Sequence, residues 1–486
     1  MSKDLLSLEP KLLWNNFYEL TCIPRPSKKE TGAVEFVKNF GKKHNLETII
    51  DSAGNVILRK PATPGYEKRK GVILQAHLDM VPQKNSDTVH DFEKDPINAY
   101  IDGEWVKAKG TTLGADNGIG LAAALAVLES KNLEHGLIEA LFTIDEETGM
   151  TGAKNLQPKV LQGHILLNLD SEDEGELYVG CAGGTDATAR FTFKEEAVPQ
   201  GSNAFELALT GLKGGHSGLD INLGRGNANK LMFRFLKEVV AEFGVRLTSI
   251  NGGSLRNAIP REAFAIVTVP KNNEEDFLLA LKDFTNIIKS ELGKTEPDLS
   301  FIAKKTELPK FVMDEVTQDD LINAIQVCPS SVVRMSTDME NLVETSLNLA
   351  IVQSTDNFVD VKALIRSSVD TAKEDVESTI ESLFRLAGAD IQFSGQYPGW
   401  KPNMDSPILK TMQNVYQSKW GKIPEVRAIH AGLECGILGS VYPVWDMISF
   451  GPTIRFPHSP DEKVNIPSVA LFWEYLVETL RSVPER

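Results

Sequence analysis

Cysteine is scarce in this chain of 486 residues: four copies stand far apart, at Cys22, Cys181, Cys328 and Cys435, and none forms a CxxC pair. That pattern excludes a disulfide scaffold. Basic residues are the minority charge, with 51 Lys and Arg against 67 Asp and Glu and a net charge of −16, which argues against nucleic acid as the main partner. The most apolar stretch, 118–128, is too short to cross a bilayer, and the first residues lack the apolar core of a signal peptide. We therefore expect a soluble, cytoplasmic protein with no membrane partner.

Several nucleotide and hydrolase motifs are also missing. The glycines of residues 114–120 have the wrong spacing for GxGxxG, and no Walker-type GxxxxGK[ST] occurs. No GxSxG elbow occurs either, which argues against a serine hydrolase of the α/β-hydrolase type.

The hydrophobic content, 42%, is sufficient for a core, and its pattern changes along the chain. Near the N-terminus, predicted strands (72–77, 137–144, 164–169) alternate with helices (9–44 with a break at 24–26, and 118–130), as in an α/β sheet covered on both faces. Alternating strands then mix with helices in an α+β pattern, and from residue 398 the first pattern returns. We predict an α/β fold: a doubly wound, mixed-sheet domain of residues 1–186 and 396–486, interrupted by an inserted α+β domain of residues 187–395.

Five short segments place polar side chains where strands end or helices begin, which is where sites form in open α/β sheets. Each has an ordinary structural explanation if taken alone: a surface pair, a helix cap, a solvated acidic loop, a turn aspartate and a structural histidine. The segments are His77-Leu78-Asp79, Gly114-Ala115-Asp116-Asn117-Gly118, Asp145-Glu146-Glu147, Leu169-Asp170 and Phe456-Pro457-His458.

Together these segments offer two histidines, two aspartates and a pair of glutamates. Histidine and carboxylate donors without thiolates suit zinc in a hydrolytic site, and manganese or cobalt also fit. Because adjacent residues diverge, one of Glu146 and Glu147 can bind a metal while the other faces the attacking water. Two metals sharing Asp116 would stand about 3.5–4 Å apart.

This set of segments resembles the M20 metallopeptidases, and within them the aminoacyl-histidine dipeptidase branch. Residues 214–221 (GGHSGLDI) and 430–436 (HAGLECG) are also typical of that branch, and the resemblance covers essentially the whole chain. It implies two divalent metal ions. His77 and Asp170 would hold one, Glu147 and His458 the other, and Asp116 would bridge them.

The resemblance implies further roles. Glu146 would be the general base, Asp79 would support His77, and the Asp116–Asn117 peptide would be cis. The inserted domain would be a lid that also forms a homodimer, and its His216 would stabilise the oxyanion.

Two residues of the lid are predicted to contact substrate. Asn257 matches a substrate-contacting position of relatives, and Arg366 would bind the free carboxylate of the substrate. Arg366 could equally be a surface arginine on a strand, and His216 a polar loop histidine between glycines.

The function implied is metal-dependent hydrolysis of dipeptides, Xaa-His and other unblocked ones. One alternative keeps the chemistry but changes the substrate, as in a deacylase of N-acyl amino acids. The other is a non-catalytic peptide- or metal-binding protein, which would be expected to lose its base. The intact Glu146 argues against that reading.

Overall fold

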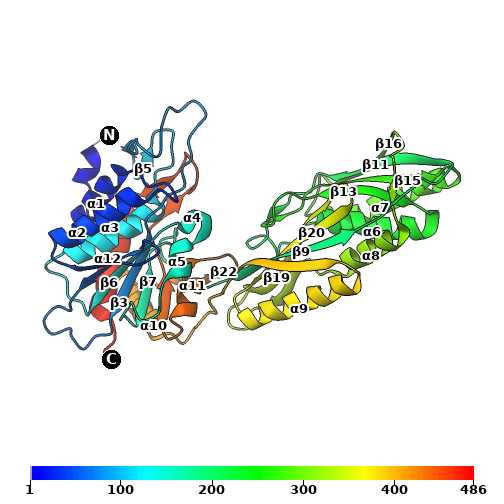
Figure 1. Ribbon diagram of the computed structural model, residues 1–486. Coiled ribbons are helices and arrows are strands. Elements are labelled where there is room, and N and C mark those ends of the chain that lie inside the picture. The colour runs from blue at the N-terminus through cyan, green and yellow to red at the C-terminus, as the bar shows by residue number, and fades with distance from the viewer. Residues whose placement is uncertain (1–2) are drawn as a thin grey trace. The chain divides into compact units, whose positions relative to one another are not determined.

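The computed structural model describes residues 3–486, which form two compact units (Figure 1). The first unit contains the residues up to Gly180 together with 402–428 and 433–486, and the second contains Cys181–Lys401 and 429–432. The boundaries predicted at 186/187 and 395/396 fall inside two strands of the second unit, β9 (Gly183–Thr192) and β21 (Asp390–Tyr397). These two strands pair with each other, so the division lies outside both.

The first unit is built on a mixed sheet. β3 (Val72–His77) runs parallel to β6 (Ile138–Thr143) and β7 (Ile165–Asn168), and β7 runs parallel to β23 (Asp446–Ser449), whereas β2 (Val56–Lys60) pairs antiparallel with β6. β3, β6 and β7 are buried along their whole length, which is the pattern of strands covered on both faces. The sheet order is β1 (Glu47–Ile50), β2 (Val56–Lys60), β6 (Ile138–Thr143), β3 (Val72–His77), β7 (Ile165–Asn168), β23 (Asp446–Ser449), β8 (Glu176–Cys181) and β22 (Glu425–Ile429).

Helices lie on both sides of this sheet (Figure 1). α1 (Lys11–Thr21), α2 (Thr31–Lys43) and α3 (Ala115–Glu129) lie on one side, and α5 (Thr151–Asn155) and α11 (Glu434–Val441) lie on the other. α3 is almost wholly buried because it packs against the sheet, α1 and α12 (Ile466–Ser482). α12 also packs against α10 (Pro407–Trp420), to which Tyr475 donates a hydrogen bond at the Met412 carbonyl. The α/β fold class predicted from the sequence is confirmed.

Short elements complete the first unit. α4 (Glu146–Gly149) follows β6 directly. A small separate sheet contains β4 (Ala99–Asp102), β5 (Trp105–Ala108), β24 (Ile454–Arg455) and β25 (Lys463–Asn465).

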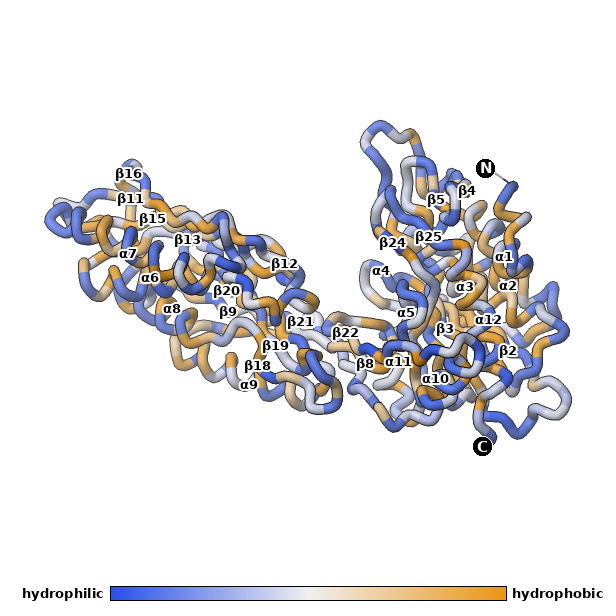
Figure 2. The backbone as a smooth tube through the Cα atoms, turned by 180° about the vertical axis from the view of Figure 1, so that it is seen from behind, coloured by the Kyte–Doolittle hydropathy of each residue, from blue (hydrophilic) through white to orange (hydrophobic). Residues whose placement is uncertain are grey.

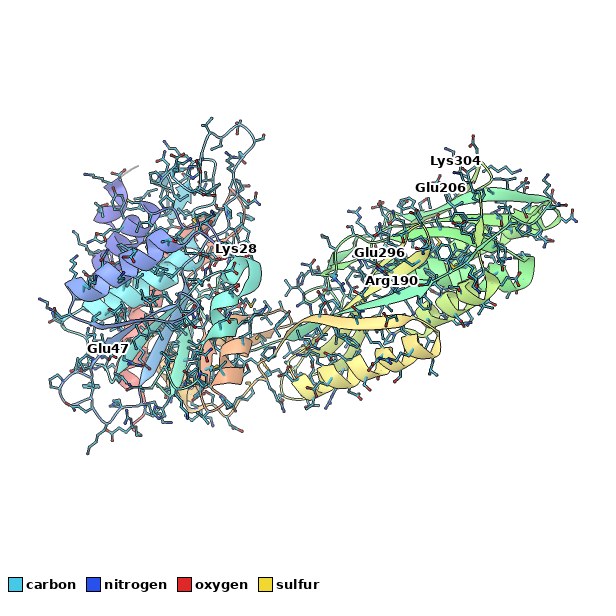
Figure 3. All side chains as sticks on the ribbon, viewed as in Figure 1. Lys28, Glu47, Arg190, Glu206, Glu296 and Lys304 are labelled. Atoms are coloured by element: carbon cyan, nitrogen blue, oxygen red, sulfur yellow. The ribbon has the colours of Figure 1, made fainter. Side chains whose placement is uncertain are left out.

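The second unit is an antiparallel sheet with helices packed against it. The core between sheet and helices is aromatic and aliphatic, with Phe205, Leu207 and Leu209 of β11 pointing into it. Glu206 alternates to the opposite face, where it stands across from Lys304 of β16; Figure 3 labels both. The sheet order is β16 (Ser300–Thr306), β11 (Ser202–Thr210), β15 (Ala263–Pro270), β13 (Arg246–Gly252), β19 (Val343–Ser354), β20 (Phe358–Ser367), β9 and β21, with β18 (Ser331–Met335) beside β19.

The helices of this unit alternate between hydrophobic and hydrophilic residues along their length, as helices with one buried face do (Figure 2). They are α6 (Ala228–Phe243), α7 (Glu274–Leu292), α8 (Glu315–Val327) and α9 (Asp370–Leu386). Among residues 3–486, no helix combines the length and apolarity needed to cross a membrane.

Candidate metal centre

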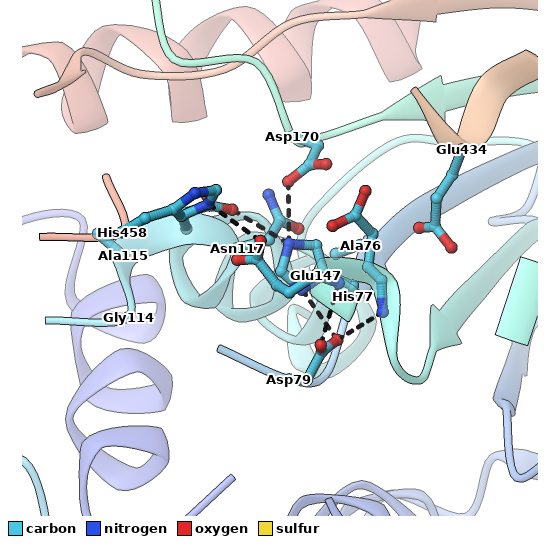
Figure 4. A network of polar contacts seen from close by, with 12 residues as sticks. Ala76, His77, Asp79, Gly114, Ala115, Asn117, Glu147, Asp170, Glu434 and His458 are labelled. Atoms are coloured by element: carbon cyan, nitrogen blue, oxygen red, sulfur yellow. Dashed lines mark hydrogen bonds and ion pairs between the residues drawn. The ribbon is translucent and has the colours of Figure 1, made fainter. Parts of the chain in front are cut away.

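His77 ends the buried strand β3 and faces carboxylates on both sides of its ring (Figure 4). Its Nδ1 lies 3.3 Å from Asp79 Oδ1, and its Nε2 lies 3.1 Å from Asp116 Oδ1 and 3.4 Å from Asp170 Oδ1. Burial alone would lower the pKa of His77, but the Asp170 charge and the bonds to Asp116, Asp170 and Asp79 raise it well above its usual value. The surroundings of the ring therefore favour positive charge.

Asp116 stands in the first turn of α3, but it does not cap the helix. The N-cap position is Gly114, which has a left-handed backbone and no side chain of its own to cap the helix. The Asp116 carboxylate instead joins two histidines, with Oδ1 near His77 and Oδ2 3.1 Å from His458 Nε2. The Asp116–Asn117 peptide is cis, as the family resemblance implies.

The two glutamates that follow β6 diverge. Glu147 Oε2 lies 3.0 Å from His458 Nε2, whereas burial raises the pKa of Glu146 well above its usual value. Asp79 holds this turn in place, because its two oxygens accept the backbone N–H groups of Glu146 and Glu147 at 3.0 and 3.2 Å. Asp79 therefore connects the His77 ring to the start of α4.

The candidate ligands form two overlapping groups that share Asp116. One contains His77, Asp116 and Asp170, and the other contains Asp116, Glu147 and His458, each with its donor atoms within 4.8 Å of one another. Contacts with Asp116 and Glu147 raise the pKa of His458 to about 11, although its side chain is half exposed.

The chemistry of this donor set fits divalent cations. Glu147 Oε1 and Asp170 Oδ1 are buried and accept no hydrogen bond. The carboxylates of Asp116, Glu147 and Asp170 share only two histidines, and buried negative charge in excess of the positive groups around it is costly. Nitrogen and oxygen donors without sulfur are typical of hydrolytic zinc, cobalt or manganese sites.

Two other groups of side chains have the spacing of metal ligands. His77, Glu146 and Glu147 form one, so Glu146 is a ligand candidate on distance alone. Glu30, Asp79 and Asp145 form the second. The oxygens of that second group already accept hydrogen bonds from backbone N–H groups and hydroxyls, which accounts for it without a metal.

Three residues of this centre were missed from the sequence. Glu434, from α11, is fully buried and accepts hydrogen bonds from Gln75 Nε2 at 2.6 Å and Thr143 Oγ1 at 2.8 Å. Arg25 and Glu462 are also buried and contact the backbone of the ligand segments. Two features of the sequence could have pointed to them: Glu462 follows His458 by four residues, and Glu434 lies in the segment 430–436 that is typical of the family branch.

The three predicted residues of the second unit lie near one another. His216 is in β12 (Gly215–His216), which pairs with β14 (Ala258–Ile259), and Ser217 N donates to the Asn257 carbonyl at 2.8 Å. Arg366 lies on β20, with its Nε 3.4 Å from Ser217 Oγ and its Nη1 3.2 Å from Tyr397 Oη. It is only 6% exposed, so the reading of a surface arginine is wrong.

His216 is oriented for donation. Its Nδ1 accepts the N–H groups of Gly218 and Leu219 at 3.2 and 3.1 Å, which leaves the proton of the neutral ring on Nε2. His430, which the sequence did not suggest as a site residue, is buried in the same unit, with its Nε2 2.7 Å from Ser346 Oγ. The positively charged Arg366 and the two nearby histidine rings favour the binding of an anionic group.

Comparison with known proteins identifies relatives that span the whole chain. The chain is 48% identical to the cytosol non-specific dipeptidase of Escherichia coli (strain K12), over 99% of this chain and the full length of that protein. The crystal structure of aminoacylhistidine dipeptidase from Vibrio alginolyticus superposes with a TM-score of 0.96 at 51% identity, covering 99% of this chain and 98% of that one. Aminopeptidase PepT from Bacillus cereus shares the fold at 17% identity, with a TM-score of 0.57 over 98% and 99% of the two chains. Residues 73–482 match the model of peptidase family M20/M25/M40, and the chain belongs to that family.

Proposed function

We propose that this protein is a dipeptidase that hydrolyses unblocked dipeptides, Xaa-His among them, with the help of two divalent cations, zinc in the first place. The observation that carries the proposal is the pair of histidine–carboxylate groups that share Asp116 beside the partly buried Glu146. Support for the substrate comes from the two relatives of about half-identical sequence, both named as dipeptidases.

The proposed ligands follow the two geometric groups. His77 and Asp170 would hold one cation and Glu147 and His458 the other, and Asp116 belongs to both groups. When bound, the cations supply Lewis acidity toward the scissile carbonyl and make water easier to ionise.

Glu146 is the proposed general base. Its carboxylate takes a proton from the attacking water as the water oxygen bonds to the carbonyl carbon, and then delivers it to the leaving amine nitrogen as the C–N bond breaks. Burial suits this task because a raised pKa makes the carboxylate a stronger base. Asp79 keeps the base in place through the Glu146 backbone and orients the His77 ring.

The second unit is proposed to act as a lid and to form a homodimer. His216 donates its Nε2 proton to the oxyanion, Arg366 binds the substrate carboxylate, and Asn257 contacts the substrate. The protein is proposed to work in the cytoplasm, like the relative whose name says so.

Metal analysis combined with substrate comparison tests the proposal. Purified protein is assayed with a Xaa-His dipeptide and with an N-acetyl amino acid, before chelation, after chelation and after Zn²⁺ is restored. We expect hydrolysis of the dipeptide that chelation abolishes and Zn²⁺ restores. Preferential cleavage of the N-acetyl amino acid would identify a deacylase, and metal-loaded protein that cleaves neither would be a binding protein.

A further inference from the structure

A buried arginine lies behind the candidate metal centre and contacts two of its segments. Arg25 is 2% exposed and is held between Pro24 and Pro26. Its Nη1 donates to the carbonyls of Leu78 and Asp79 at 3.0 and 2.7 Å, and its Nη2 donates to the Gly114 carbonyl at 2.5 Å. One guanidinium thus connects the segment that carries His77 to the loop that carries Asp116.

A buried carboxylate holds the same loop through its N–H groups. Glu462 is 2% exposed, and each of its oxygens accepts two consecutive backbone N–H groups at 2.7–3.1 Å. The last of these N–H groups belongs to Asp116 itself. Because Glu462 follows His458 by four residues, it connects the segment of that histidine to the Asp116 loop. The four donors belong to Leu113, Gly114, Ala115 and Asp116.

Two glycines make room for the guanidinium. A Cβ at Gly114 or at Gly118 would come within 2.7 Å of Arg25 Nη2, and Gly114 also has a positive φ of 70°. These are the glycines on either side of Asp116, and their spacing matches no phosphate-binding motif. Their role in the structure is to admit a charged side chain below the loop.

We propose that Arg25 and Glu462 are positioning residues that fix the distances between the His77, Asp116 and His458 segments, and thereby set the affinity of the centre for its cations. The inference rests on the proposed function, because it takes those residues as ligands. Hydrogen bonds to charged groups are about twice as strong as neutral ones. The three bonds from Arg25 and the four to Glu462 hold the three ligand segments together against the mutual repulsion of the ligand carboxylates. Neither side chain is among the candidate ligands.

Glu462→Gln tests the carboxylate, with Glu139→Gln as the matched control. The glutamine amide presents an NH₂ group to two of the four N–H donors, so part of the loop loses its acceptor. Glu139 is equally buried, accepts the N–H groups of Gln162 and Gly163, and pairs with an arginine, Arg59. It lies at the other end of β6 from the metal centre.

Metal affinity is the decisive measurement. Zn²⁺ affinity by chelator competition, and the visible absorption spectrum of the Co²⁺-loaded protein, report on the centre without any turnover. We expect Glu462→Gln to weaken Zn²⁺ binding roughly 10- to 100-fold, the usual range for residues that support metal ligands, and to change the Co²⁺ spectrum. Glu139→Gln should lower the melting temperature of the metal-free protein but leave affinity and spectrum unchanged. Equal losses of affinity in both variants would show a general loss of stability and overturn the proposal.

Gly118→Ala gives a second test that leaves both charges in the chain. Its methyl group displaces the Arg25 guanidinium, so we expect weaker Zn²⁺ binding here too, even if Glu462→Gln does not fold. Wild-type affinity in a folded Gly118→Ala protein would overturn the role of Arg25. Failure of the wild-type protein to bind Zn²⁺ or to cleave dipeptides would instead overturn the proposed function, so the two failures are distinguishable.

Discussion

Replacement of His430 by glutamine should make the second unit less sensitive to acid. The His430 side chain is 5% exposed, and its Nε2 lies 2.7 Å from Ser346 Oγ, a contact that a glutamine amide can reproduce. Burial, together with the nearby charge of Arg366, lowers the pKa of His430 from 6.5 to about 3. The folded protein therefore keeps this ring neutral at pH values where the unfolded chain protonates it.

The size of the effect follows from proton linkage. Between the folded pKa of about 3 and the unfolded value of 6.5, the unfolded state binds one more proton. The free energy of unfolding then falls as the pH falls, by about 1.4 kcal/mol per pH unit. Above the unfolded pKa the group has no effect. From pH 7 to pH 5 the wild-type protein should lose about 2 kcal/mol through this histidine, and His430→Gln should not.

Hydrogen exchange followed by mass spectrometry can measure this loss within the second unit. Peptides from β19 and β20 of both proteins are compared at the same pH, so the intrinsic exchange rates cancel. As the pH falls from 7 to 5, we expect the opening free energy of the wild type to fall relative to that of His430→Gln. At pH 5 the variant should therefore be as stable as the wild type, or more stable. A difference that stays constant over this range would refute a neutral, buried His430.

Three further predictions concern the reaction. The Glu146→Gln protein should keep its metal ions, and its kcat should fall about 10²- to 10⁴-fold because the general base is lost. A loss of metal content would instead make Glu146 a metal ligand, as its distances allow. His216→Ala should lower kcat while metal content, measured by atomic spectroscopy, stays at the wild-type value; loss of metal would contradict its proposed role as an oxyanion donor. Arg366→Ala should mainly raise KM for dipeptides, since it removes a buried partner for the substrate carboxylate, and unchanged steady-state kinetics would remove Arg366 from the site.

Much of the first unit and its centre could be predicted because the signals are local. β3, β6 and β7 are mostly apolar and are buried along their length, and a polar residue directly after such a run must emerge at the end of the strand. The same logic predicts that His77, Glu147 and Asp170 lie at one edge of the sheet.

The contacts behind the centre could not be predicted because they depend on distant parts of the chain. Gln75 and Glu434, which share a hydrogen bond, are 359 residues apart. An arginine between two prolines is typical of an exposed loop, and only the packed structure shows Arg25 to be buried.

Some elements of the fold were also missed. α8 was not predicted, although its N-cap Asp314 accepts the N–H of Thr317. β18 was missed because most of its residues are exposed, so it lacks the alternation of a strand with one buried face.

The place of β23 in the first sheet has a consequence for synthesis on the ribosome. β23 lies between β7 and β8, yet it is made after the whole 181–401 segment. Until it emerges, the buried strand β7 has an open edge, and the centre lacks His458 as well. The second unit can therefore complete its own core first, while the N-terminal part of the first unit waits for residues 402–449 to be made and leaves the edge of β7 open to pairing with other chains.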